Sequence, residues 1–163
     1  MSIEVLNKEK AAVNVGMGQI ALLEGNGEAK SVLGSCIGLV LYHERRKVGA
    51  VGHIVLPLSQ DRPGPPGKFA DTAVPHMLDQ LLEKGGNPAG LIAKMAGGAN
   101  MFGSSGPLQI GDANFAKVEE LLEGLGIPII GRHIGGDKGR RISFENQTGD
   151  LIVEIMGETA VIL

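Results

Sequence analysis

The chain has 163 residues, of which 43% are hydrophobic and 20% are charged, and its formal net charge is −3. This length and balance predict a single domain, residues 1–163, with enough apolar surface for one packed core, and they argue against disorder. An acidic chain with 3% aromatic residues and no Trp lacks the basic and stacking surfaces that nucleic-acid binding needs, so that class is disfavoured.

Signals for membrane insertion and secretion are also missing. No apolar run reaches the roughly 18 residues that a membrane-spanning helix needs, and residues 1–4 do not begin a secretory signal. The one cysteine, Cys36, excludes an internal disulfide and a multi-cysteine zinc site. We therefore expect a protein of the reducing cytoplasm that carries no cofactor.

The N-terminal half predicts short strands joined by tight turns. Residues 1–13 show no clear hydrophobic period and are expected to form a loose arm. Residues 19–23 and a second strand that leads into 33–36 flank the turn 25–27, and are predicted to pair as a hairpin. Residues 37–42 and 48–56 predict a second hairpin around the polar turn 44–47. The Pro- and Gly-rich segment 58–68 is expected to be an irregular loop.

Two helices are predicted to alternate with strands further along the chain. The first begins near Asp71 or Thr72 as its N-cap and ends at 85–86, and the second begins at Asp112 and ends at 124–126. Their apolar faces are Val74, Met77, Leu78, Leu81 and Leu82, and Val118, Leu121, Leu122 and Leu125. Strands are predicted at 91–95, 127–130, 141–145, 151–155 and 160–163. The predicted fold class is α/β, with packed mixed β-sheets and outer helices.

Cys36 follows Gly34 and Ser35 directly before a predicted strand. Gly34 permits a sharp backbone turn, and amide groups at such a turn can hold an oxyanion. A lone cysteine, however, is more often a small buried hydrophobe than a nucleophile. By itself, this residue leaves both interpretations open.

His53 lies in the second strand of the predicted 37–56 hairpin. A two-residue loop would place Cys36 directly opposite His53, and a four-residue loop over 44–47 would place Cys36 opposite Val55 and diagonal to His53. Both registers put the two side chains on one face, with Cβ atoms roughly 5 to 8 Å apart. A loop one residue longer or shorter would put them on opposite faces, so the pattern permits a Cys–His pair but does not require one. An imidazole at this position could take the thiol proton and deliver it to a leaving group. The alternative is a core histidine with a structural role.

The other histidines are weaker candidates. His43 and His76 are expected to be exposed or capping residues. His133 lies in the Gly-rich basic segment 132–141, which could bind an anion but matches no nucleotide-binding motif, and which is more often a solvated turn. A zinc site built from the one cysteine and two histidines lacks paired ligand spacing.

Four sequence blocks occur in an order that resembles a known family. They are LGSC at 33–36, GHIVLP at 52–57, GKFADTA at 67–73 and AGGANMF at 96–102, and the segments around Asn114 and 135–140 also fit. Together they resemble the CheD family, the chemoreceptor glutamine deamidases of bacterial and archaeal chemotaxis. The resemblance runs from about residue 16 to residue 157.

The resemblance implies an enzyme that hydrolyses the side-chain amide of particular glutamines on methyl-accepting chemoreceptors, giving glutamate and ammonia. Some family members are also associated with receptor methylester hydrolysis, and many interact with the chemotaxis phosphatase CheC. The implied fold is an α/β arrangement of packed mixed sheets shared with a bacterial toxin deamidase. The family's nucleophilic cysteine matches Cys36, and its histidine matches His53.

One position departs from the family pattern. The third catalytic residue of the family is a Thr six positions before the cysteine, where this chain has Lys30. Ser31 is adjacent, but a one-residue shift along a strand points a side chain to the other face. Either the strand adjusts locally, another group orients the histidine, or activity is weakened. In the last case the protein would act as a binding regulator of the receptor or of a CheC-type phosphatase.

Two further expectations concern the substrate surface. Residues that flank the Pro- and Gly-rich loop, together with Phe102, are expected to accept a glutamine that protrudes from a receptor helix. Arg140 and Arg141 either contact an acidic flank of that helix or belong to a solvated turn. A third function remains open, a cysteine hydrolase that acts on another protein glutamine or ester.

Overall fold

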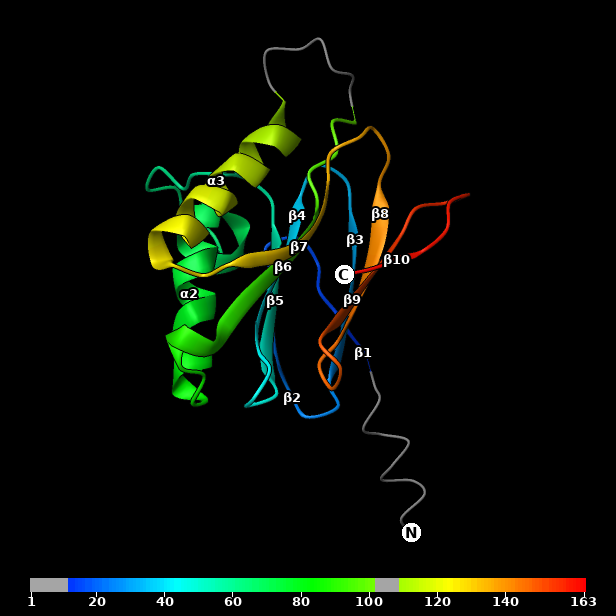
Figure 1. Cartoon of the computed structure of the whole chain (residues 1–163). Helices are drawn as coiled ribbons and strands as arrows, with labels where there is room; N and C mark the ends of the chain where they lie inside the picture. The colour runs from blue at the N-terminus through cyan, green and yellow to red at the C-terminus, as the bar shows by residue number, and fades with distance from the viewer. Residues whose placement is uncertain (1–11, 102–108) are drawn as a thin grey trace.

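The computed structural model describes residues 12–101 and 109–163. Two five-stranded sheets lie face to face, and two helices cover the outer face of one of them (Figure 1). The α/β class with packed mixed sheets and outer helices, predicted from the sequence, is confirmed. Phe102 and residues 1–11 of the predicted N-terminal arm lie outside the described residues. Residues 12 and 13, which were also predicted to belong to the arm, are part of a strand.

The first sheet, called sheet A, forms one layer on its own. Its strand order is β1-β3-β8-β9-β10, with β1 Ala12–Asn14, β3 Glu28–Leu33, β8 Arg140–Glu145, β9 Asp150–Glu154 and β10 Val161–Ile162. The β1–β3 pair is parallel and the other pairs are antiparallel, so the sheet is mixed.

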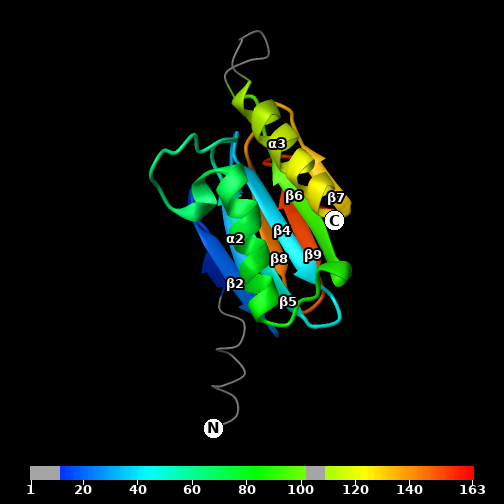
Figure 2. The same ribbon diagram turned by 90° about the vertical axis from the view of Figure 1, so that its left-hand side faces the viewer.

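The second sheet, called sheet B, lies between sheet A and the helices. Its order is β2-β5-β4-β6-β7, with β2 Ile20–Glu24, β5 Val48–Ile54, β4 Ile37–His43, β6 Leu91–Gly97 and β7 Ile129–Ile134. The helices α2 Ala70–Glu83 and α3 Ile110–Leu125 lie across this sheet (Figure 2), and the short helices η1 Pro66–Lys68 and η2 Pro88–Gly90 lie in its connections.

The hairpin predicted around 25–27 is wrong. Both strands exist, but β2 pairs with β5 in sheet B while β3 pairs with β1 and β8 in sheet A. Alternate residues of β3, Ala29, Ser31 and Leu33, are buried, because this face of the strand packs against sheet B. The turn therefore carries the chain from one layer to the other instead of joining two neighbours in one sheet.

The hairpin predicted over 37–56 is confirmed. His43 pairs with Val48, which leaves a four-residue loop at 44–47, and Gly38 pairs with His53. All seven residues of β4 and of β5 are buried, because the helices cover one face of sheet B and sheet A covers the other. Leu39 and Leu41 contribute to the core under the helices, whereas Cys36 and Val40 contribute to the core between the sheets.

The predicted helix caps are wrong, although both helices exist. Asp71 lies in the first turn of α2 and accepts hydrogen bonds from the amide (3.0 Å) and hydroxyl (3.2 Å) of Ser59. Thr72 also lies inside α2. Asp112 lies in the first turn of α3 and accepts a hydrogen bond from the Asn100 side chain (3.1 Å). These side chains fasten neighbouring loops to the helices, a role that depends on tertiary structure.

The apolar faces of the helices are correct apart from their last residues. Val74, Met77, Val118 and Leu122 are fully buried. The predicted core residues Leu82 and Leu125, in the last turns of α2 and α3, are instead 41% and 45% exposed. Among the described residues, no helix is long and apolar enough to cross a membrane.

Candidate active site

Cys36 and His53 lie at one end of the core between the sheets, where β4 begins and β5 ends, at the upper end of Figure 1. Ile37 pairs with Ile54 and Gly38 with His53. Continuing this register by one residue puts Cys36 opposite Val55, with His53 as its diagonal neighbour on the same face. The structure therefore has the second of the two predicted registers. Cys36 is 8% exposed and His53 is 4% exposed.

A glycine on β4 lets the two sheets approach closely at this point. Gly38 shares a face with Cys36 and His53. A Cβ atom at position 38 would lie 2.6 Å from Cδ1 of Ile142 and 2.8 Å from Cδ1 of Leu33, both on sheet A. Since real Cβ atoms do not approach so closely, a larger residue here would force these two side-chain methyl groups to shift, and the glycine lets sheet A pack over the histidine without that shift.

The ring of His53 is held by two groups: the hydroxyl of Ser31 on β3 of sheet A, and the carbonyl of Val15 in the segment that leads from β1 of sheet A to β2 of sheet B. Its Nδ1 atom lies 2.9 Å from Oγ of Ser31 and 3.1 Å from the carbonyl oxygen of Val15. Ser31 Oγ in turn donates to the same Val15 oxygen over 2.6 Å. Because a carbonyl only accepts, this network assigns the ring proton to Nδ1 and leaves Nε2 as the basic nitrogen.

The residue beside His53 is therefore Ser31 and not Lys30. Lys30 is exposed on the opposite face of β3, with its ammonium 3.8 Å from the carboxylate of Glu28. Charged residues at the alternate positions Glu28 and Lys30 mark the solvent face of the strand. That alternation was the sequence signal that assigns Ser31 to the inner face, five positions before Cys36.

Burial keeps the Cys36–His53 pair neutral. It raises the pKa of the Cys36 thiol, and it lowers the pKa of His53, with an opposing smaller effect from the hydrogen bond to the Val15 backbone. At neutral pH the resting site thus contains a thiol and an uncharged imidazole. Such a pair acts by moving the proton as the sulfur attacks, rather than from a preformed thiolate.

The loop that carries Cys36 is fixed through its carbonyl groups. The carbonyls of Gly34 and Cys36 accept hydrogen bonds from the amides of Ala99 (3.0 Å) and Gly98 (2.9 Å). Gly97, at φ +114°, lies so close to the Cys36 carbonyl that a Cβ atom there would collide with it. The AGGAN block at 96–100 of the sequence therefore forms the support of the Cys36 loop.

Two predictions about other residues are corrected by burial. Arg140 is 4% exposed, and its guanidinium donates to Nδ1 of His133 (2.8 Å), the His133 carbonyl (2.6 Å) and the Gly135 carbonyl. It holds the 133–136 turn and does not face a partner, whereas Arg141 is exposed. His43, expected at the surface or as a cap, is buried, although its Nδ1 does accept a bond from the Arg46 amide (3.2 Å).

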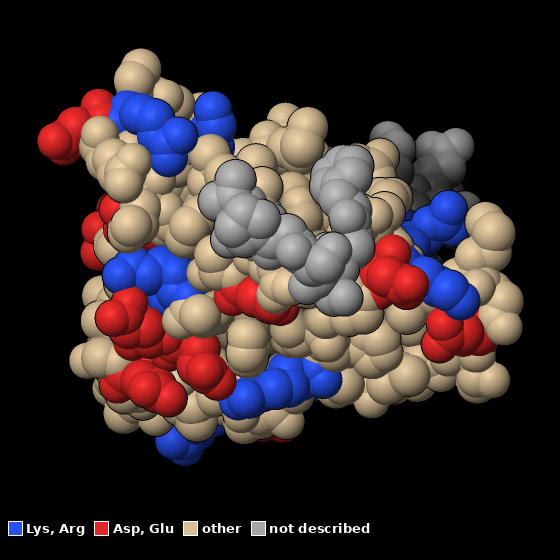
Figure 3. Space-filling model, turned by 90° about the horizontal axis from the view of Figure 1, so that it is seen from above, with Lys and Arg blue, Asp and Glu red and all other residues tan. Residues whose placement is uncertain are grey.

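Seen from above, charged side chains lie around much of the rim of this end of the molecule (Figure 3). Within the described part of the chain, no three His, Cys, Asp or Glu side chains gather as metal ligands. His76 is exposed on α2.

A thiol, an imidazole and a hydroxyl that orients the imidazole, gathered at the end of two packed sheets, form an arrangement that suits thiol-dependent acyl transfer. Residues 55–155 match the family described as CheD chemotactic sensory transduction. The chain belongs to the CheD family.

Curated relatives cover almost the whole chain. The probable chemoreceptor glutamine deamidase CheD of Caldanaerobacter subterraneus subsp. tengcongensis is 39% identical, over 91% of this chain and 96% of its own length. The chemoreceptor glutamine deamidase CheD of Thermotoga maritima is 36% identical, over 88% of this chain and 91% of its own. The probable chemoreceptor glutamine deamidase CheD of Methanococcus maripaludis (strain C6) is 37% identical, over 86% and 93% respectively.

Proposed function

We propose that this protein hydrolyses the side-chain amide of glutamines on methyl-accepting chemoreceptors, giving glutamate and ammonia. The names of the relatives support the substrate. The observation that carries the chemistry is the contact between Ser31 Oγ and His53 Nδ1, on the face that His53 shares with Cys36. It leaves Nε2 of His53 free to act as a base toward a nearby thiol.

In the first half of the reaction, Nε2 of His53 takes the proton of Cys36 while the sulfur attacks the carboxamide carbon. The negative charge moves to the amide oxygen, which accepts hydrogen bonds from backbone amides at Ser35 and Cys36, next to Gly34 in the turn. The imidazolium then protonates the nitrogen. The C–N bond breaks, ammonia leaves and an acyl thioester remains.

In the second half, water attacks the thioester carbon as Nε2 of His53 removes its proton. The tetrahedral intermediate collapses, the C–S bond breaks and the sulfur recovers the proton from the imidazolium. Glutamate is released and the resting neutral pair is restored. Ser31 and the Val15 carbonyl keep the ring oriented through both halves, since both contact the Nδ1 side.

The names of the relatives support chemoreceptors as partners, and the resemblance to the family suggests a phosphatase. We propose that the protein acts in the cytoplasm on receptor helices and that a CheC-type phosphatase binds near the same site. The binding-regulator alternative depended on the lack of a hydroxyl group at Lys30. Ser31 supplies a hydroxyl beside His53, so the structure gives that alternative less support.

The test is mass spectrometry of peptides from a chemoreceptor cytoplasmic fragment incubated with the wild type and with Cys36→Ala. We expect the wild type to convert defined glutamines to glutamate and Cys36→Ala to convert none, with unchanged circular dichroism. Conversion by Cys36→Ala would disprove the nucleophile. A folded wild type that binds the fragment but releases no ammonia would favour the regulator.

A further inference from the structure

Asn114 is a polar residue on the apolar face of α3. It is fully buried and lies in line with Val118 and Leu122, which belong to the core under the helices. A buried amide is costly unless it is hydrogen-bonded. The Asn114 Nδ2 group donates to the carbonyl oxygens of Ser35 (3.1 Å) and Val55 (2.9 Å). The polar side chain therefore has two specific backbone targets.

Those targets belong to the two elements that carry the proposed reaction. The Ser35 carbonyl is part of the peptide group that joins Ser35 to Cys36, and Val55 follows His53 by two residues at the end of β5. A single side chain thus connects the loop of the thiol to the strand of the imidazole. None of these contacts involves the side chain of Cys36 or His53.

The hydrogen bond from Asn114 to the Ser35 carbonyl also fixes the direction in which the next N–H group, that of Cys36, points. In a trans peptide the C=O and the following N–H point in opposite directions, and the described chain has no cis bond. The Gly34 carbonyl points to the Ala99 amide and the Ser35 carbonyl points to Asn114. The N–H groups of Ser35 and Cys36 therefore point away from these partners, and neither donates to another residue that the structure describes.

We propose that Asn114 is a positioning residue that directs the Cys36 amide toward the developing oxyanion. This inference rests on the proposed function. Free amides beside an attacking sulfur can hold the negative charge of a tetrahedral intermediate. Without Asn114, the Ser35–Cys36 peptide could rotate to pair its carbonyl elsewhere, and the amide would lose its direction.

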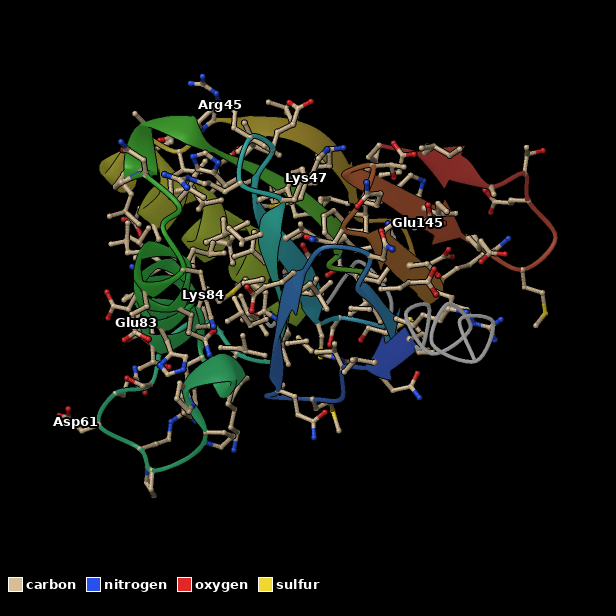
Figure 4. The ribbon with its side chains drawn as sticks, turned by 90° about the horizontal axis from the view of Figure 1, so that it is seen from below. Arg45, Lys47, Asp61, Glu83, Lys84 and Glu145 are labelled. Atoms are coloured by element: carbon tan, nitrogen blue, oxygen red, sulfur yellow. The ribbon has the colours of Figure 1, made fainter. Side chains whose placement is uncertain are left out.

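Asn146 is a matched control at the other end of the molecule. It is also fully buried, and its Nδ2 group also donates to two carbonyls, those of Gly25 (2.9 Å) and Lys47 (2.8 Å). Figure 4 shows this end from below, with Lys47 and Glu145 labelled. Replacing either asparagine with Ala removes two hydrogen bonds from a side-chain amide to backbone carbonyls, but only those of Asn114 reach the Cys36 loop.

The experiment measures kcat and KM for deamidation of a receptor fragment, and separately the rate at which iodoacetamide alkylates Cys36. Alkylation displaces iodide at carbon and creates no oxyanion, so it reports only the thiol. We expect Asn114→Ala to lower kcat about 100-fold, with KM and the alkylation rate within about threefold of the wild type. Asn146→Ala is expected to lower the melting temperature by about as much as Asn114→Ala does, but to leave kcat within about threefold of the wild-type value.

Two results would overturn the role of Asn114. One is an unchanged kcat in Asn114→Ala. The other is a parallel loss of alkylation and deamidation, which would indicate displacement of the thiol itself. If Asn114→Ala does not fold, Asn114→Ser retains one donor, and about a tenfold loss of kcat at an unchanged alkylation rate is expected. A wild type that deamidates nothing would disprove the proposed function separately, through the wild-type arm.

Discussion

At the scale of single residues, a hydroxyl and a backbone carbonyl orient His53 where other enzymes use a carboxylate. Ser31 Oγ donates to Val15 O and can therefore accept from Nδ1–H, so both ring contacts hold one tautomer. Neither group is charged. The imidazolium thus receives no ion-pair stabilisation, which agrees with a pKa of His53 that burial lowers.

Ser31→Ala should lower kcat about tenfold, because it removes one of two hydrogen-bond acceptors of Nδ1–H, while the Val15 carbonyl still holds the ring. Steady-state ammonia release from a receptor fragment measures this. Lys30→Ala is the control, since that side chain is exposed on the opposite face, and we expect its kcat to equal that of the wild type. Equal losses in the two variants would contradict the assignment of Ser31.

The pH dependence of the site follows from its neutral resting state. Because burial lowers the pKa of His53, the acid limb of kcat/KM should lie below the ordinary histidine value of about 6.5. Because burial also raises the pKa of Cys36, alkylation by iodoacetamide should keep rising above the pH at which a free thiol is already ionised. A plateau of alkylation near neutral pH would instead indicate a thiolate–imidazolium pair.

At the scale of elements, two glycines of ordinary conformation have opposite roles. Gly38 on β4 faces the terminal methyl groups of Ile142 and Leu33 of sheet A, and a Cβ atom at this position would have to displace them. Gly124 on α3 has open space around its Cβ position. The first lets the side chains of the two layers pack closely, and the second is only a weak point in a helix.

Gly38→Ala should lower the free energy of unfolding by about 1–3 kcal/mol, the usual effect of overpacking a core. Gly124→Ala should raise it by about 0.5–1 kcal/mol, since alanine is the better helix former. Urea unfolding followed by circular dichroism measures both. An unchanged midpoint for Gly38→Ala would mean that the sheets move apart at little cost.

At the scale of the whole molecule, the site exists only when the two sheets are packed together. Ser31 belongs to sheet A, whereas His53 belongs to sheet B and Cys36 to the loop that joins the sheets. Burial of His53 between the sheets therefore links its protonation to the stability of the entire fold. Its folded-state pKa is the lower one, so the unfolded chain takes up a proton first as the pH falls.

Above about pH 6.5 the titration of His53 should consequently add no pH dependence to the free energy of unfolding. As the pH falls from about 6.5 to the lowered folded-state pKa of His53, the free energy of unfolding should decrease. Comparing wild type with His53→Gln by urea unfolding across this range isolates the contribution. The difference between the two proteins should shrink as the pH falls. A difference that grows on acidification would reverse the sign of the assigned pKa shift.

The sequence by itself determined the local features of this protein. The 37–56 hairpin and the helices follow from alternation and from helical periodicity within short segments. The common face of Cys36 and His53 was one of the possible registers, and the four-residue loop at 44–47 selects it. Only the tertiary structure decided which sheet each strand joins, that Ser31 and not Lys30 meets His53, and that Asn114 and Arg140 are buried. Local alternation indicates that Ser31 lies on the inner face of its strand, but which residue it meets there, like the other outcomes, depends on contacts between segments far apart in the chain.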